Sequence, residues 1–192
     1  MADLSSLGNL APVETLDVDE TYVPAKESTF RLPAKGEYTL RAPESFPTEA
    51  FGTTKAGHLS VQIDPTIVGP TNENFQLRFQ KVSAKPFERG GVKVSQAGDY
   101  LRANGFSGRL TSVQDIADAV EATAGNTYKA QLDWRAYNSQ TGFQVEGMEK
   151  FPKLEDGSHQ SWIEDPTSPE DADGKRTRVP ARLFIRRFIA AS

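Results

Sequence analysis

An aromatic ring stands among three cations in the segment SAKPFERGGVK, where Phe87 lies close to Lys85, Arg89 and Lys93. An exposed ring can stack on a nucleobase, and cations beside it can contact phosphates. The glycines favour a loop, which suits a clamp that adapts to its ligand. The alternative is that Phe87 anchors the loop to the core. This loop is the strongest single candidate in the chain for contact with a nucleic acid.

The loop EAFGTTKAG has the same character on a smaller scale, with Phe51 near Lys55. Here too the ring can either anchor the loop or meet a ligand. A further candidate surface comes from strands with alternating residues, because their polar side faces away from the core. The other interpretation of this surface is an ordinary solvated sheet face. Its candidate contacts are three phosphate-binding cations and one stacking ring: Arg78, Lys129, Arg135 and Tyr137.

Catalytic and metal-binding chemistry find little support in the residue types. The 192-residue chain has two histidines and no cysteine, and His58 and His159 are far apart in the sequence. A zinc site would therefore need carboxylates for most of its ligands. The segment FERGGVKVS lacks the spacing of a phosphate-binding glycine loop, and no nucleophile elbow is present. We expect a protein that is not an enzyme and needs no metal or cofactor.

Three segments of alternating apolar residues precede any helical pattern, and this alternation predicts half-buried strands. The third segment, NFQLRFQKV, turns Gln76, Arg78 and Gln80 toward solvent. The predicted inward residues of the three strands are Tyr38, Leu40, Ala42, Leu59, Val61, Ile63, Phe75, Leu77 and Phe79.

The period then changes to that of a helix. VSQAGDYLRANGF predicts a short helix from about Ser95 to Gly105. TSVQDIADAVEATAG predicts a second helix, with Thr111 or Ser112 as its N-cap and Gly125 at its end. Its narrow apolar stripe indicates that this helix covers a core.

The stretch YKAQLDWRAYNSQTGFQVEGM alternates, breaks at NSQTG and alternates again, which predicts a hairpin. Trp134 shares a side with Leu132, so we expect its ring in the core, with stacking on a base as the alternative. The same reasoning turns Tyr128 and Phe143 inward and leaves Asp133 solvated.

The predicted order is three strands, a helical connection and two strands, and this is the order found in an oligonucleotide-binding (OB) fold. In this fold five strands close a small barrel and a helix between the third and fourth strands covers one end. The sequence therefore predicts a mainly β protein with a five-stranded OB-like barrel, helices between strands 3 and 4, and a C-terminal extension.

Several sequence segments also resemble those of a known class of proteins. FRLPAKGEYTL, TKAGHLSVQIDPTIVG, DYLRANGF with the helix after it, and GNTYKAQLDWRAYNSQTGFQVEGMEKF occur in an order that resembles phage-encoded single-stranded DNA-binding proteins of the OB-fold class, or related phage replication and recombination accessory proteins. The likeness covers roughly residues 28–151. It implies binding of exposed single strands without base specificity. Several such proteins end in an acidic tail, whereas the acidic block of this chain lies upstream of a basic C-terminus.

Charge is unevenly distributed, although the net charge is only −4. Residues 1–25 hold five acids and no base, residues 151–174 hold seven acids and one base, and residues 175–192 hold six bases and no acid. We therefore predict a flexible acidic arm (1–27), an OB-like barrel domain (28–152), an acidic loop or linker (153–174) and a basic, apolar C-terminal segment (175–192) that packs or oligomerises.

The segment ARLFIRRFI has two interpretations. As a strand it would put Arg182, Phe184, Arg186 and Phe188 on one face, interleaving cations with rings. As a helix it would present an apolar cluster to the barrel or to another subunit. Packing or self-association and direct DNA contact both remain open, and the acidic block at 155–173 is expected to compete with DNA for this segment.

The expected function is sequence-tolerant binding of single-stranded DNA in phage DNA replication, recombination or repair. The alternative is a non-catalytic virion or assembly protein, in which the C-terminal segment would join subunits into a homo-oligomer. The first twenty residues lack the basic start and apolar run of a signal peptide, and no segment approaches about 18 apolar residues. We expect no membrane partner and a cytoplasmic location, in the host cell if the protein is phage-encoded.

Overall fold

The computed structural model describes residues 32–69 and 71–190. The predicted acidic arm at 1–27 lies outside the described residues. Twelve strands and two α-helices make the described part mainly β, which confirms the predicted class. The elements follow in the order β1 (Gly36–Arg41), η1 (Thr48–Ala50), β2 (Phe51–Thr53), β3 (Leu59–Gln62), β4 (Thr66–Val68), β5 (Lys81–Ser83), β6 (Phe87–Arg89), β7 (Val92–Val94), α1 (Gln96–Ala103), α2 (Val113–Glu121), β8 (Thr127–Tyr137), β9 (Gln144–Glu146), η2 (Met148–Lys150), β10 (Trp162–Glu164), β11 (Arg178–Pro180) and β12 (Arg182–Ile189).

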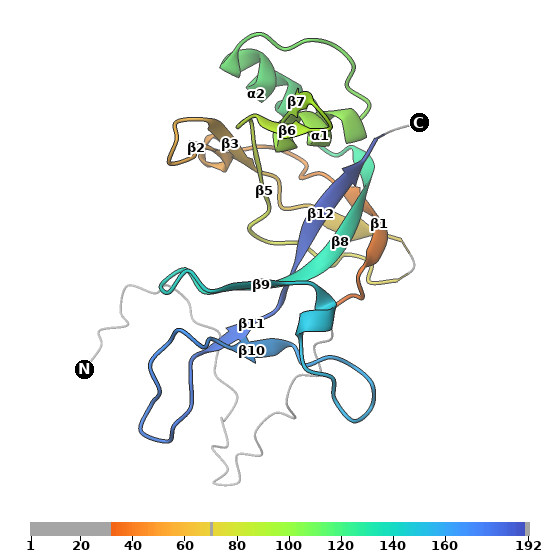
Figure 1. The fold of residues 1–192 in the computed structure, drawn as a ribbon. Helices are drawn as coiled ribbons and strands as arrows, with labels where there is room; N and C mark the ends of the chain where they lie inside the picture. Colours follow the sequence, from red (N-terminus) through yellow and green to blue (C-terminus); the bar gives the residue numbers. More distant parts are fainter. Residues whose placement is uncertain (1–31, 70, 191–192) are drawn as a thin grey trace, which may run out of the picture. The chain divides into compact units, whose positions relative to one another are not determined.

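The largest sheet has the order β12-β8-β1-β4, and β9 pairs with the C-terminal end of β8 (Figure 1). All of these pairs are antiparallel. A second sheet has the order β2-β3-β5, while β6 with β7 and β10 with β11 form two-stranded ribbons. Within the described residues no backbone ladder joins β5 to β12, so the strands do not form a closed barrel.

The core lies between the two larger sheets and α1. Residues predicted to point inward fill it, including Leu40, Val61 and Leu132, each no more than 1% exposed. Trp134 is buried as predicted, and its indole Nε1 donates a hydrogen bond to the Pro33 carbonyl at 2.9 Å. Side-chain alternation therefore identified most of the buried face of these strands.

Both predicted helices form, and each begins after an N-cap residue that the sequence indicated. The Ser95 hydroxyl accepts a hydrogen bond from the Gly98 amide at the start of α1. At the start of α2, Ser112 and Asp115 form a reciprocal capping box, and Gly125 follows the helix with φ +70°. Because α1 buries Tyr100 and Leu101 against β5, β8 and β12, it covers one end of the core.

The predicted fifth strand is wrong in its length and its role. β9, which contains Val145, has only three residues, whereas β12 pairs with β8 from Arg182 to Ile189. The main partner of β8 thus comes from the C-terminal segment, beyond the predicted barrel boundary at residue 152. Leu183 and Ile185 turn their apolar side chains toward the core, which explains why this segment packs within its own sheet.

Two interruptions of alternation changed which residues face inward. Phe79 has φ +61°, a conformation that reverses the side of the chain on which the next side chain lies. As a result Phe79 is 59% exposed and Gln80 only 7% exposed, the reverse of the prediction, while Gln76 and Arg78 are exposed as predicted. In β12 the register shifts between Ile185 and Arg187, which turns Phe188 inward instead of outward.

The predicted linker at 153–174 contains β10 and an ordered turn around Asp165. The Asp165 carboxylate is fully buried and accepts hydrogen bonds from the side chains of Asn138, Thr141 and Thr167. This carboxylate therefore joins the turn after β8 to the segment between β10 and β11. In the described residues the acids of this block do not pair with the basic side chains of β12.

Candidate functional site

The β6–β7 hairpin carries Phe87, Arg89 and Lys93 of the strongest predicted loop, and Lys85 lies two residues before β6. Phe87 is 39% exposed, and the Arg89 guanidinium lies 5.2 Å from the centre of its ring. Arg89 also pairs with Asp99 of α1 through an Nη2–Oδ2 distance of 2.9 Å. Lys85 and Lys93 are exposed and have no carboxylate partner among the described residues. The hairpin and the residues just before it thus present two unpaired cations and a ring to solvent.

The second predicted loop is divided between core and surface. Phe51 begins β2, is half-buried and packs 6.4 Å from the Phe46 ring, so it anchors the loop. Lys55 is exposed in the turn between β2 and β3. Of this pair, only the lysine remains available to a ligand.

The outer face of β8 contains the predicted polar residues, but some of their charged groups form ion pairs. Lys129 pairs with Glu37 of β1 at 3.2 Å. Asp133, predicted to be solvated, is 2% exposed and pairs with Arg186 of β12 at 3.1 Å, while the Trp134 and Met148 amides also donate to it. Lys129 and Arg186 are therefore partly neutralised.

Arg135 and Arg182 form a different arrangement at the other end of this face. They are directly opposite each other in the β8–β12 register. The Arg135 guanidinium lies 5.0 Å from the Phe184 ring centre, and the Arg182 guanidinium lies 5.0 Å from the Phe79 ring centre. Neither arginine has a carboxylate within 4.0 Å in the described part of the chain. We call Phe79, Arg135, Arg182 and Phe184 the seam cluster, because they span the gap between residue 79 and β12.

The seam cluster lies beside two other predicted residues. Arg78 is exposed immediately before Phe79, and Tyr137, 56% exposed, follows Arg135 by two positions on the same face of β8. No hydrogen bond, ion pair or ring contact between described residues joins this group to the β6–β7 hairpin. Most of the predicted contacts therefore fall into two surfaces, while Lys55 lies apart on the β2–β3 turn. In the seam cluster, Phe79 is the residue that alternation had assigned to the core.

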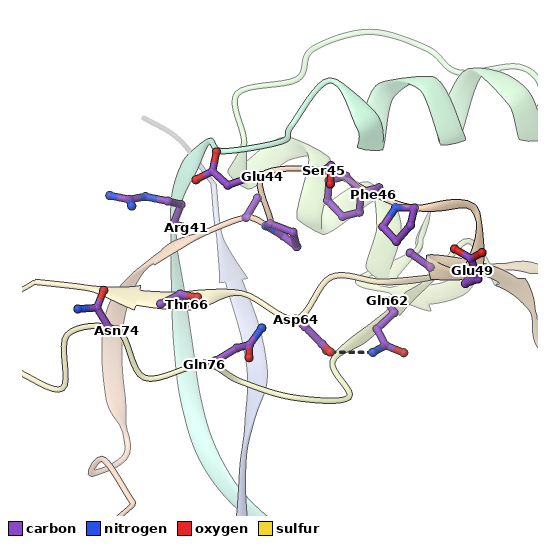
Figure 2. Close-up of a pocket in the computed structure, with 14 residues that line it drawn as sticks. Arg41, Glu44, Ser45, Phe46, Glu49, Gln62, Asp64, Thr66, Asn74 and Gln76 are labelled. Carbon is purple, nitrogen blue, oxygen red and sulfur yellow. Dashed lines mark hydrogen bonds between the residues drawn. The ribbon is translucent and has the colours of Figure 1, made fainter. Parts of the chain in front are cut away.

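A pocket of about 690 Å³ opens on another surface, where the segment after β1 faces β3 and β4 (Figure 2). Glu44, Glu49 and Asp64 line it, with Arg41 as its one basic residue. Asp64 is already engaged, because Oδ2 accepts from the Gln62 amide and Oδ1 accepts from the Gln80 backbone, both at 2.7 Å. An excess of carboxylates repels phosphates, so this pocket does not suit a nucleic-acid backbone.

Two buried tyrosines, one on α1 and one on β8, are unsuited to a surface role. Tyr100 is fully buried and shares a 2.7 Å hydrogen bond with Thr123, and burial raises its pKa to about 12. Burial, with a smaller contribution from Tyr100, also raises the pKa of Tyr128 well above 10. Both hydroxyls therefore stay neutral in the core.

The described residues do not form a metal centre. No group of three or more histidine, aspartate or glutamate side chains in residues 32–69 and 71–190 is arranged to hold a metal ion. Neither described helix has the length and apolar character required to cross a bilayer.

Comparison with protein-family models, with curated proteins and with solved structures finds no match to this chain.

Proposed function

We propose that this protein binds single-stranded DNA without sequence preference, in phage DNA replication, recombination or repair. The observation that carries the proposal is the seam cluster, in which two arginines without carboxylate partners among the described residues share an outer sheet face with Phe184 and lie beside the exposed ring of Phe79. Binding of an unpaired strand needs cations for its phosphates and ring faces for its bases. Because every base has a stackable face, such a surface would tolerate any sequence.

The strand order supports an OB-like arrangement as the scaffold. The five components would be β1, the β3–β4 segment, the segment ending in β5, β8 and β12, with α1 and α2 between the third and fourth. The Gln80 side chain spans the gap that backbone pairing leaves: Nε2 donates to the Leu183 carbonyl at 3.1 Å and Oε1 accepts from the Ile185 amide at 3.2 Å. A side-chain amide would thus take the place of the last backbone ladder.

The surface proposed to bind DNA differs from the one that OB folds commonly use. OB folds commonly bind oligonucleotides across strands 2 and 3, and the corresponding surface here carries the acidic pocket with Glu44, Glu49 and Asp64. We therefore assign the DNA to the outer face of β8 and β12, with Arg78 and Tyr137 beside it. Phe87 and Lys93 of the β6–β7 hairpin, with Lys85 just before it, would add a second contact.

The alternative role in virion assembly has less support. It was based on an acidic N-terminal arm, a β-rich body and an apolar C-terminal strand that could be exchanged between subunits. That segment contains β12, in which seven of the eight residues pair with β8 inside the same sheet.

A charge-removal experiment tests the proposal. In the variant Arg78→Gln/Lys85→Gln/Lys93→Gln, three exposed cations are removed while Arg89, which pairs with Asp99, is kept. We expect weaker binding to labelled oligo(dT) and a shallower dependence of affinity on salt, by about 0.7 in the log–log slope for each phosphate that the variant no longer neutralises. Electrophoretic mobility shift or fluorescence anisotropy at several salt concentrations measures both.

The matched control removes the same number of charges elsewhere, in Lys150→Gln/Lys153→Gln/Lys175→Gln, which should bind as the unaltered protein does. Absence of any oligo(dT) binding at low salt by the unaltered protein would contradict the proposed function. Equal losses of affinity in the two triple variants would instead indicate a nonspecific effect of net charge.

A further inference from the structure

The seam cluster contains a charge arrangement that the sheet itself does not stabilise. Like charges directly opposite each other on antiparallel strands repel and weaken the pairing. Arg135 and Arg182 occupy such positions. On its other side Arg135 is opposite Glu146 of β9, yet these two side chains are not within 4.0 Å, and Glu146 accepts a hydrogen bond from Gln144 instead. Neither guanidinium therefore forms an ion pair with a carboxylate of the described residues.

Each guanidinium in the cluster also has a ring beside it. Phe184 and Phe79 lie 5.0 Å from Arg135 and Arg182, respectively, a separation at which cation and ring attract. A ring contact does not use the N–H groups of arginine as hydrogen bonds to carboxylates would. Five N–H donors on each side chain thus remain suited to an oxyanion.

Phe79 is exposed in a conformation that is costly for its residue type. Its φ of +61° lies in the left-handed region, which bulky residues rarely adopt. The next residue holds this turn in place, because the Gln80 amide donates to Asp64 at 2.7 Å and the Gln80 side chain binds β12. Residues held in such strained backbone conformations cluster at active sites and ligand sites.

We propose that Arg135 and Arg182 together bind one phosphate of an unpaired DNA strand, and that an adjacent base stacks on Phe79. This inference rests on the proposed function and specifies its central contact. A phosphate between the two guanidiniums would remove their mutual repulsion. The stacking contact requires a base that is not already stacked within a duplex, so it favours single strands over double-stranded DNA.

The test uses the full-length protein and two labelled probes, oligo(dT) and a DNA duplex of equal length. The variants are Arg135→Gln, Arg182→Gln, the double variant, Phe79→Asn and Phe79→Tyr. The matched control is Arg109→Gln, which removes an exposed arginine from the loop between α1 and α2. Fluorescence anisotropy gives the affinities, and thermal unfolding gives Tm for each protein.

We expect each single arginine variant to lose about tenfold or more in oligo(dT) affinity, the range for a hydrogen bond to a charged group. Because both arginines would hold one phosphate, the double variant should lose less than the product of the two single losses. Phe79→Asn should lose at least about fivefold on oligo(dT) and nothing on duplex, and Phe79→Tyr should retain binding. Arg109→Gln should bind as the unaltered protein does.

Thermal stability separates a binding role from a structural one. Removing one of two facing arginines relieves repulsion, and asparagine tolerates the left-handed conformation better than phenylalanine. Each variant also loses one cation–ring contact, whose contribution of about 0.5–1 kcal/mol is similar in size. Tm should therefore change little in Arg135→Gln, Arg182→Gln and Phe79→Asn while affinity falls, and a loss of affinity that accompanies a large fall in Tm would overturn the inference.

The remaining outcomes are also decisive. If the unaltered protein binds oligo(dT) and the cluster variants bind equally well, the proposed contact is wrong while the proposed function stands. Strictly multiplicative losses of affinity in the double variant would reject the shared phosphate, and an equal effect of Phe79→Asn on duplex would reject base stacking. If the unaltered protein binds neither probe, the function and the contact both fail.

Discussion

The seam between residue 80 and β12 depends on one side-chain amide, so Gln80→Met should destabilise the protein. Methionine has a similar length and fits an apolar site, but it cannot pair with the Leu183 carbonyl or the Ile185 amide. Leu183 is 3% exposed, so water cannot readily replace the missing partner of its carbonyl, whereas Ile185 is only half-buried. Each unpaired buried group costs about 1–3 kcal/mol, and the free energy of unfolding should fall by about 2–4 kcal/mol.

Urea unfolding, followed by tryptophan fluorescence, measures this loss of stability, since Trp134 is buried next to β12. The matched control is Gln76→Met, an exposed position in the same segment, which should change the free energy by no more than about 0.5 kcal/mol. Hydrogen exchange gives a second reading, because the Ile185 amide should exchange faster in Gln80→Met. If Gln80→Met unfolds at the same urea concentration as Gln76→Met, the side-chain amide does not hold the seam.

Two further predictions concern paired carboxylates. Arg186→Ala would leave the 3%-exposed Asp133 side chain without its cation, and we expect a loss of about 3 kcal/mol in urea unfolding; full retention of stability would show that the Trp134 and Met148 amides suffice. The backbone amide of Thr111, with further hydrogen bonds from Thr111 and Ser112, lowers the pKa of Asp115 from 3.8 to about 2. Its carboxylate therefore stabilises the fold above pH 4, and this contribution disappears as the pH falls toward 2. Asp115→Ala should lower Tm at pH 7 but progressively less between pH 4 and pH 2, whereas a Tm difference independent of pH would argue against the capping box.

Local patterns in the sequence were sufficient for the elements whose geometry is repetitive. Alternation identified the buried sides of β1, β3 and most of β8, because successive side chains in a strand point to opposite faces. Ser95 indicated the start of α1, and Thr111 or Ser112 that of α2, because a hydroxyl at this position satisfies free amides of the first turn. The structure has Ser95 and Ser112 in this role. These features depend on neighbours within a few residues, and the sequence contains all of them.

Alternation could not identify the exposed ring of the seam cluster. The rule placed Phe79 inside and Gln80 outside, because nothing in NFQLRFQKV indicates a positive φ at a phenylalanine. The conformation is held by partners distant in sequence, Asp64 and the β12 backbone. Likewise, the register shift at Arg186 depends on the pairing of β12 with β8 and on the ion pair between Arg186 and Asp133.

The sequence by itself determined a mainly β protein with two capped helices and a set of cations opposite its apolar side chains. Only the tertiary structure decided that the C-terminal segment supplies the strand next to β8, and that Arg135 and Arg182 face each other there. The physical reason is that strand partners and facing charges are long-range relations: their free energy depends on groups that the chain brings together only when it folds.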